Sequence, residues 1–140
     1  MSVRTLLFTP RGFLITGGIV LLVLGILGFL NMFTSQTFYM TTGENVAHVT
    51  LGIVALAAVW VPGLNRALAP YYRSLVITVG LIALFFAMYG FLLPGGNPPV
   101  TLNTFGVANL EFMDNVIHLL VAAWAFAAAF WTQETSAISI

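Results

Sequence analysis

The sequence predicts an all-α integral membrane protein, a four-transmembrane-helix bundle built from two tandem helix-hairpin repeats. Three observations lead to this fold class. Of the 140 residues, 60% are hydrophobic and only 6% are charged, whereas a soluble domain carries roughly 25% charged residues. The charges lie between or at the edges of four long apolar runs. The second half of the chain also repeats the residue pattern of the first. Since a domain takes about 100–200 residues, we expect a single membrane domain over residues 1–140.

The four apolar runs are each long enough to cross a bilayer. A transmembrane helix needs about 17–25 mostly apolar residues, and it satisfies its own backbone hydrogen bonds, which lipid cannot do. The runs show no period-two alternation of the kind that a membrane β-barrel requires. The predicted helices cover residues 12–33, 44–62, 74–93 and 111–131.

The distribution of arginine predicts the orientation. The chain has four basic residues and no lysine. All four precede the first run or lie between the second and third; they are Arg4, Arg11, Arg66 and Arg73. Because basic residues favour the cytoplasmic side, we expect both termini in the cytoplasm (N-in/C-in). The loops at 34–43 and 95–111 then face outward.

Composition excludes several function classes. With no lysine and a formal net charge of +0, the chain has no basic patch for nucleic acid phosphates, and a nucleic acid partner is not expected. With no cysteine, it forms no disulfide, thiolate metal site or iron–sulfur cluster.

An internal duplication is predicted from the match between residues 11–62 and 73–132. The segment Glu-Asn-Val-Ala-His at 44–48 matches Asp-Asn-Val-Ile-His at 114–118, which lies 70 residues later. Further matching pairs are Arg11 with Arg73, Gly18 with Gly80, Gly28 with Gly90, and Ala55 with Ala125. Each copy holds two helices, so both have the same topology, and the copies are related by an axis along the membrane normal.

Each acid-Asn-x-x-His segment begins a stripe on one helix face. Residues spaced by three or four positions lie on the same face of a helix, and small residues there allow two helices to pack closely in lipid. The stripes contain Glu44, His48, Gly52 and Ala55 in the first copy, and Asp114, His118, Ala122, Ala125 and Ala129 in the second. Both histidines are therefore expected to point into the bundle near its outer mouth.

A structural interpretation explains these polar residues without a ligand. Thr41-x-x-Glu44 has the spacing of a capping box, and an acid in the first turn is favoured by the helix dipole. A carboxylate four residues before a histidine can accept the imidazole N–H. Asn45 and Asn115 would then form hydrogen bonds between helices.

A functional interpretation makes the same residues a ligand site. His48, His118, Glu44 and Asp114 together have the donor chemistry for zinc, iron, manganese or copper. A single histidine could instead bind the metal of a haem or a chlorophyll. Proton handling or substrate recognition is a third alternative, since histidine titrates near neutral pH. Asn31, at the end of the first run, is a further candidate for this polar network.

With Asn45 and His48, and Asn115 and His118, at the starts of helices two and four, the chain resembles a family of small four-helix bacterial membrane proteins. This family, common in actinobacteria and cyanobacteria, is the DUF4383-like domain of unknown function. The resemblance covers nearly the whole chain and implies a bacterial cytoplasmic membrane or a thylakoid-type membrane. It implies no activity.

We therefore expect a non-catalytic membrane protein that acts as an accessory, stabilising or assembly subunit of a larger complex. Its expected partners are lipid and either other membrane-protein subunits or further copies of the chain. The alternative is a protein that binds a metal, haem or chlorophyll through the two histidines. A small transporter or channel is less favoured, because the interior is rich in alanine and leucine and no proline breaks a helix within its span.

Overall fold

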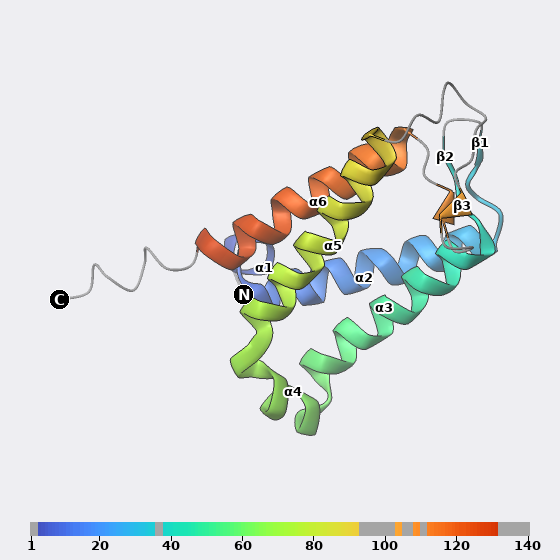
Figure 1. The fold of residues 1–140 in the computed structure, drawn as a ribbon. Coiled ribbons are helices and arrows are strands. Elements are labelled where there is room, and N and C mark those ends of the chain that lie inside the picture. The colour runs from blue at the N-terminus through green and yellow to red at the C-terminus, as the bar shows by residue number, and fades with distance from the viewer. Residues whose placement is uncertain (1–2, 36–37, 93–102, 105–107, 110–111, 132–140) are drawn as a thin grey trace.

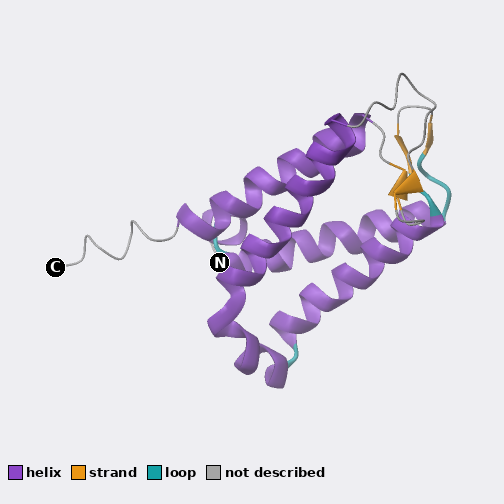
Figure 2. Cartoon of the chain, viewed as in Figure 1, coloured by secondary structure: helices purple, strands orange, loops and turns teal. Residues whose placement is uncertain are grey.

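The computed structural model describes residues 3–35, 38–92, 103–104, 108–109 and 112–131. Helices make up most of this part of the chain (Figures 1 and 2). In chain order the elements are α1 (Val3–Leu7), α2 (Pro10–Phe29), β1 (Thr34–Ser35), β2 (Phe38–Tyr39), α3 (Thr42–Trp60), α4 (Pro62–Leu68), the 3-10 helix η1 (Ala69–Tyr71), α5 (Tyr72–Leu92), β3 (Asn103–Thr104), β4 (Ala108–Asn109) and α6 (Phe112–Phe130).

Helix α2 has a defined capping structure at each end. Thr9 caps its start by accepting a hydrogen bond from the Gly12 N–H at 3.0 Å, and Pro10 fills the first position, where its missing N–H costs nothing. At the other end, Asn31 adopts a positive φ of 56°, and the N–H of Met32 bonds to the Leu27 carbonyl at 3.1 Å. This is a Schellman ending. The expected place of Asn31 in a histidine network is therefore wrong, because this exposed residue terminates the helix.

Helix α3 begins with the capping box that its sequence predicts. The Thr41 hydroxyl accepts a hydrogen bond from the Glu44 N–H at 3.2 Å, and the Glu44 carboxylate accepts one from the Thr41 N–H at 2.6 Å. The two bonds satisfy backbone donors that the first turn leaves without helical partners. The Glu44 carboxylate therefore serves as part of the N-terminal cap of α3.

The connection from α3 to α5 is helical as well. Pro62 begins α4, and the tight turn η1 leads into α5. The Tyr72 hydroxyl lies 2.8 Å from the Ala58 carbonyl and 3.0 Å from Asn65 Oδ1. Through these contacts the start of α5 is held against the end of α3.

Two short strand pairs were not predicted. Antiparallel β1–β2 follows α2, and antiparallel β3–β4 follows α5. Both fall in segments that were expected to be loops, at 34–43 and 95–111. Strands of two residues are too short to produce a detectable alternation of apolar and polar residues. Each half of the chain thus runs helix, strand pair, helix.

Within the described residues, four helices are long and apolar enough to cross a membrane, which confirms this part of the fold prediction. They are Pro10–Phe29, Thr42–Trp60, the continuous helical stretch Pro62–Leu92, and Phe112–Phe130. Their bounds agree with the predicted runs within a few residues, except that the third begins earlier because α4 and η1 precede α5.

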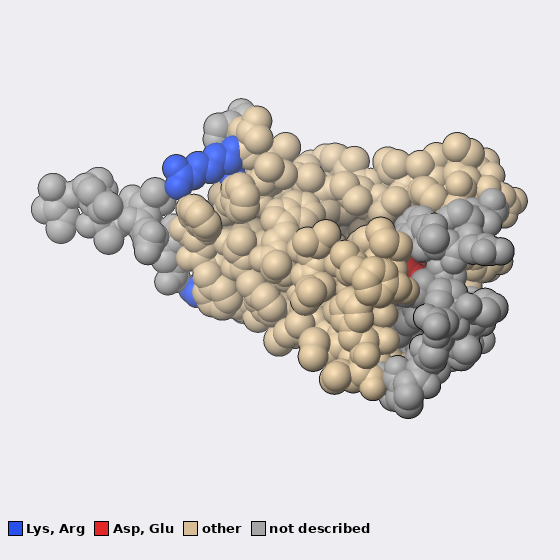
Figure 3. Space-filling model, turned by 90° about the horizontal axis from the view of Figure 1, so that it is seen from above, with Lys and Arg blue, Asp and Glu red and all other residues tan. Residues whose placement is uncertain are grey.

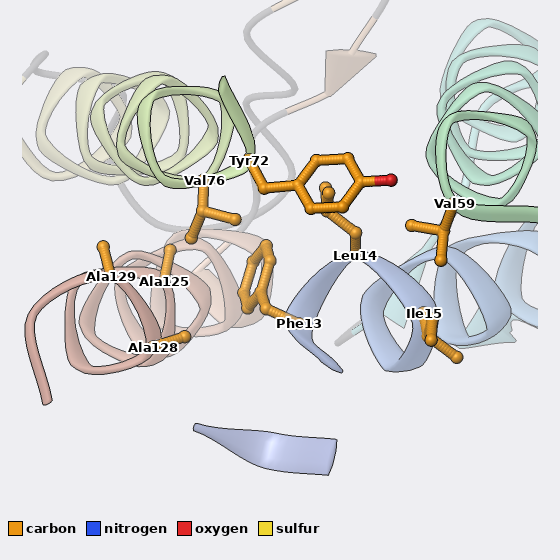
Figure 4. Packing of buried hydrophobic residues seen from close by; sticks show 9 residues of the cluster. All are labelled: Phe13, Leu14, Ile15, Val59, Tyr72, Val76, Ala125, Ala128 and Ala129. Atoms are coloured by element: carbon orange, nitrogen blue, oxygen red, sulfur yellow. The ribbon is translucent and has the colours of Figure 1, made fainter. Parts of the chain in front are cut away.

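The helices pair as two antiparallel hairpins, α2 with α3 and α5 with α6, and α2 supplies the main contacts between the hairpins. A cluster of buried apolar residues joins them where α2 and α5 begin and where α3 and α6 end. Figure 4 shows its members, which are Phe13, Leu14, Ile15, Val59, Tyr72, Val76, Ala125, Ala128 and Ala129. Toward the opposite end, where the strand pairs lie, the hairpins separate (Figure 1).

The short helix α1 is held against the rest of the protein. The Trp124 indole N–H donates to the Leu7 carbonyl at 2.6 Å, and the Thr16 hydroxyl donates to the Leu6 carbonyl at 3.3 Å. Gly12 lies so close to the Leu6 carbonyl group that a side chain there would overlap it. These contacts give the last carbonyls of α1 the partners that a helix end needs.

Among the described residues, the basic and acidic side chains lie at opposite ends of the helices. The four arginines lie in α1 and α4 or at the second residue of α2 and of α5, and we call this end the arginine end. Glu44 and Asp114 lie in the first turns of α3 and α6, at what we call the acidic end. Figure 3 shows the blue basic groups and the red acidic group at opposite ends of the visible face.

Candidate functional site

The acid-Asn-x-x-His segments occupy the first two turns of α3 and α6, at the acidic end. In both helices the acid and the asparagine are buried while the histidine is half-buried. Glu44 and Asp114 are each 8% exposed, and Asn45 and Asn115 are each 3% exposed. The two helix starts therefore bury the same residue types to the same extent.

Asn45 packs into a gap that a glycine leaves on α2. Its amide group lies against Gly28, so close that a Cβ at Gly28 would overlap the Oδ1 atom. The Oδ1 atom is enclosed and accepts no hydrogen bond from an N–H or O–H group in the described structure. It lies instead in the direction of a glycine Cα–H bond, a contact worth about 0.5–1 kcal/mol.

Asn115 repeats this arrangement on the second hairpin. Its amide lies against Gly90 of α5, and again a Cβ there would overlap Oδ1 and approach Nδ2 to 2.6 Å. Its Oδ1 is also enclosed without a hydrogen-bond donor within the described residues. The hydrogen bonds between helices that we expected from both asparagines are therefore not made by these oxygens. A buried amide that lacks a partner costs about 1–3 kcal/mol, so close packing must offset this cost in both hairpins.

The small residues of the two stripes lie where α2 meets α3 and where α5 meets α6. Gly52 faces the Gly18 carbonyl oxygen, which would lie 2.8 Å from an added Cβ. The space beside Gly18 is bounded by Ala55 at 3.2 Å, and the space beside Gly80 by Ala125 at 3.2 Å. Ala122 and Ala129 of α6 are each 1% exposed.

His118 has a fixed orientation. Its Nδ1 lies 2.8 Å from the backbone carbonyl of Asp114, and because a carbonyl only accepts, Nδ1 carries the proton and Nε2 has the free lone pair. The ring also contacts Phe86, with ring centroids 5.6 Å apart. The expected partner was the Asp114 carboxylate, and this expectation is wrong because the Nδ1–H is donated to the Asp114 backbone carbonyl instead.

His48 differs from its counterpart. Its Nδ1 is buried and has no hydrogen-bond partner in the described structure. The Glu44 carboxylate, which was expected to hold this ring, is bonded to the Thr41 N–H and hydroxyl instead. No hydrogen bond or ring contact among the described residues joins His48 to His118, although the two imidazoles lie within electrostatic range of each other.

A metal site with four protein ligands is not assembled in the part of the chain that the structure describes. There, no three residues of the types His, Asp and Glu come together in a way that could hold a metal ion. The four predicted ligands were His48, His118, Glu44 and Asp114. Of these, the Glu44 carboxylate accepts the hydrogen bonds of the capping box. What the segments do bring together is an imidazole and a buried asparagine on each hairpin.

Sequence reasoning missed several residues that shape this region and the opposite end. Phe86 of α5, which the spacing of the histidine segments does not point to, contacts the His118 ring. Trp124 and Tyr72 were not assigned hydrogen bonds, because their acceptors are backbone carbonyls far away in the sequence or in another helix. The spacing of residues within one helix carries no signal for such partners.

Comparison of the chain with protein-family models, with curated proteins and with solved structures finds no match. The resemblance to a family of small four-helix bacterial membrane proteins stays a prediction.

Proposed function

We propose that this chain is a small, non-catalytic integral membrane protein that acts as an accessory, stabilising or assembly subunit of a larger membrane complex. The observation that carries the proposal is the apolar face of α3 that points away from α2. Leu51, Ile53 and Val54 on this face are 54–59% exposed, and within the described structure α3 packs extensively only on α2 and α4. Such a face is suited to lipid or to the helix of a partner subunit.

Cross-linking in native membranes tests the proposed subunit role. The chain has no native cysteine, so a single Ile53→Cys variant carries a defined attachment point for a photoreactive cross-linker. We expect a covalent adduct with another membrane protein, or with a second copy of the chain, that mass spectrometry can identify. Leu81→Cys, at an equally exposed position of α5, gives the second hairpin an attachment point of the same exposure. A chain that cross-links to no protein from either position would contradict the subunit role.

The proposed orientation places both termini in the cytoplasm of a bacterial cell, in the cytoplasmic membrane or a thylakoid-type membrane. The arginine end supports it, because the four basic residues lie in or at the starts of the helices there, and basic residues favour the cytoplasmic side. Figure 3 shows basic groups at this end of the visible face. A membrane-impermeant thiol reagent applied to intact cells should label a cysteine at Tyr39, near the acidic end. It should not label a cysteine at Asn65 in α4. The reverse labelling pattern would invert the orientation.

We also propose that the two hairpins arose by duplication of one unit, as residues 11–62 and 73–132. The support is the equivalence of contacts: Gly28 meets Asn45 as Gly90 meets Asn115, and Gly18 meets Ala55 as Gly80 meets Ala125. Each unit also has the order helix, strand pair, helix.

A second candidate function is ligand binding at the histidines, and the geometry of His118 favours it. A ring whose Nδ1–H is held by a backbone carbonyl presents Nε2 in a fixed direction, as metal-ligating histidines do. The ligand would be a metal ion, a haem or a chlorophyll. Absorption spectra and metal analysis of gently extracted protein test this, with His118→Ala expected to lose the ligand and Phe86→Leu expected to retain it. A colourless, metal-free wild-type sample would contradict this function.

A further inference from the structure

Arg73 is the one arginine among the described residues whose surroundings resemble a binding site. Its guanidinium lies over the Phe130 ring, with the central carbon 5.1 Å from the ring centroid. Its Nε atom is enclosed and has no hydrogen-bond partner in the described structure, while part of the side chain remains exposed. A cation held over an aromatic face in this way loses rotational freedom and part of its hydration.

The counterpart of Arg73 in the first hairpin lacks these surroundings. Arg11 is the second residue of α2 just as Arg73 is the second residue of α5, but Arg11 is exposed to solvent. The position that corresponds to Phe130 is Trp60, which is 57% exposed and has no such contact with Arg11 among the described residues. The enclosure of Arg73 is therefore a property of the second hairpin and not of every helix start at the arginine end.

The described part of the protein offers Arg73 no carboxylate. Its acids are Glu44 and Asp114, and both lie in first turns at the opposite end of the helices. Partial removal from water strengthens the attraction of the guanidinium for an anion, because the local dielectric constant falls. An anion from outside the described chain would complete this site.

We propose that Arg73, oriented by Phe130, binds the phosphate of an anionic phospholipid headgroup at the arginine end of α5 and α6. The planar guanidinium donates two parallel N–H bonds to phosphate oxygens, and basic sites at the cytoplasmic ends of membrane helices bind acidic headgroups. The acyl chains of the lipid then lie along the exposed apolar surfaces of α5 and α6. The inference rests on the membrane insertion proposed above but not on the subunit role.

Native mass spectrometry of the full chain in a non-ionic detergent tests the proposal, with phosphatidylglycerol and phosphatidylcholine of equal chain length as probes. We expect the wild-type chain to prefer phosphatidylglycerol. Arg73→Gln should weaken phosphatidylglycerol binding on the order of thirtyfold, as expected for loss of a hydrogen bond to a charged group. The matched control Arg11→Gln should weaken it by about fivefold or less, the effect of one surface charge. Phosphatidylcholine carries the same phosphate beside a cationic choline, so Arg73→Gln should weaken its binding less than it weakens phosphatidylglycerol binding.

Further variants keep the outcome decisive if Arg73→Gln does not fold. Arg73→Lys keeps the positive charge but loses the two parallel N–H donors of the guanidinium. Phe130→Leu keeps the charge but loses the aromatic ring that orients it. Both variants should reduce the preference for phosphatidylglycerol. Equal losses in the Arg73 and Arg11 variants, or no lipid preference in the wild type, would overturn the proposal. Displacement of the lipid by millimolar inorganic phosphate would overturn it in favour of a soluble anion. Glu134 follows α6 in the sequence and lies outside the described residues. Clearly stronger phosphatidylglycerol binding by Glu134→Gln than by the wild type would overturn the proposal in favour of an internal ion pair with Arg73. Membrane insertion is tested separately by the cysteine labelling described above.

Discussion

Replacing Gly28 with alanine tests the packing of asparagine against glycine more directly than any other change. The new Cβ would overlap the Asn45 Oδ1 atom and would lie 2.9 Å from Nδ2, closer than a methyl group can approach. The asparagine is 3% exposed, so either the two helices must separate or the amide must leave its buried position.

The magnitude follows from two opposing effects. Overpacking of a well-packed site costs about 1–3 kcal/mol, whereas alanine stabilises a helix over glycine by about 0.5–1 kcal/mol. We therefore expect Gly28→Ala to lower the free energy of unfolding by about 1–2 kcal/mol. Gly63→Ala is the matched control, because nothing lies within 4 Å of the position its Cβ would occupy. The control keeps the helix gain without the clash and should not be destabilised.

The assay is equilibrium unfolding in mixed detergent micelles, followed by circular dichroism. A double-mutant cycle with Asn45→Ala isolates the pair, because a methyl group at residue 28 is harmless once the amide is gone. The coupling energy should exceed about 1 kcal/mol, and the Gly90 and Asn115 cycle should give a similar value. Additive effects in both cycles, or equal stability of Gly28→Ala and Gly63→Ala, would refute the reasoning.

Three further substitutions have defined outcomes. Thr41→Ala removes the capping box and should destabilise the protein by about 0.5–2 kcal/mol in the same unfolding assay, while Thr41→Ser should keep most of that stability. Tyr72→Phe removes the hydrogen bond to the Ala58 carbonyl and should cost about 1–2 kcal/mol; an unchanged unfolding midpoint would show that this bond is not formed. Trp124→Phe removes the donor to the Leu7 carbonyl, and we expect tryptic cleavage within α1 to accelerate several-fold, a result that equal cleavage rates would contradict.

The sequence contained enough to predict the helices but not all of their contacts. Long apolar runs specify four spanning helices because each helix satisfies its own backbone, and Thr41-x-x-Glu44 specifies a cap because both partners lie within one turn. The partners of His118 and Trp124 were not predictable in the same way. His118 had both a carboxylate and a carbonyl of Asp114 within reach, and spacing alone does not decide between them. Trp124 found its acceptor 117 residues away, beyond the range of any periodic pattern.

The hydrogen bond between Trp124 and Leu7 also has a consequence for the order of assembly. Each hairpin is made of helices adjacent in sequence, and such local contacts form early because little loop-closure entropy is lost. During synthesis, α2 and α3 can pair before α6 exists. Helix α1 is made before both hairpins, and its Leu7 carbonyl gains the Trp124 donor only once α6 is in place. Its docking therefore reports that both hairpins are complete and joined, which makes protection of α1 from protease a time marker for the end of folding.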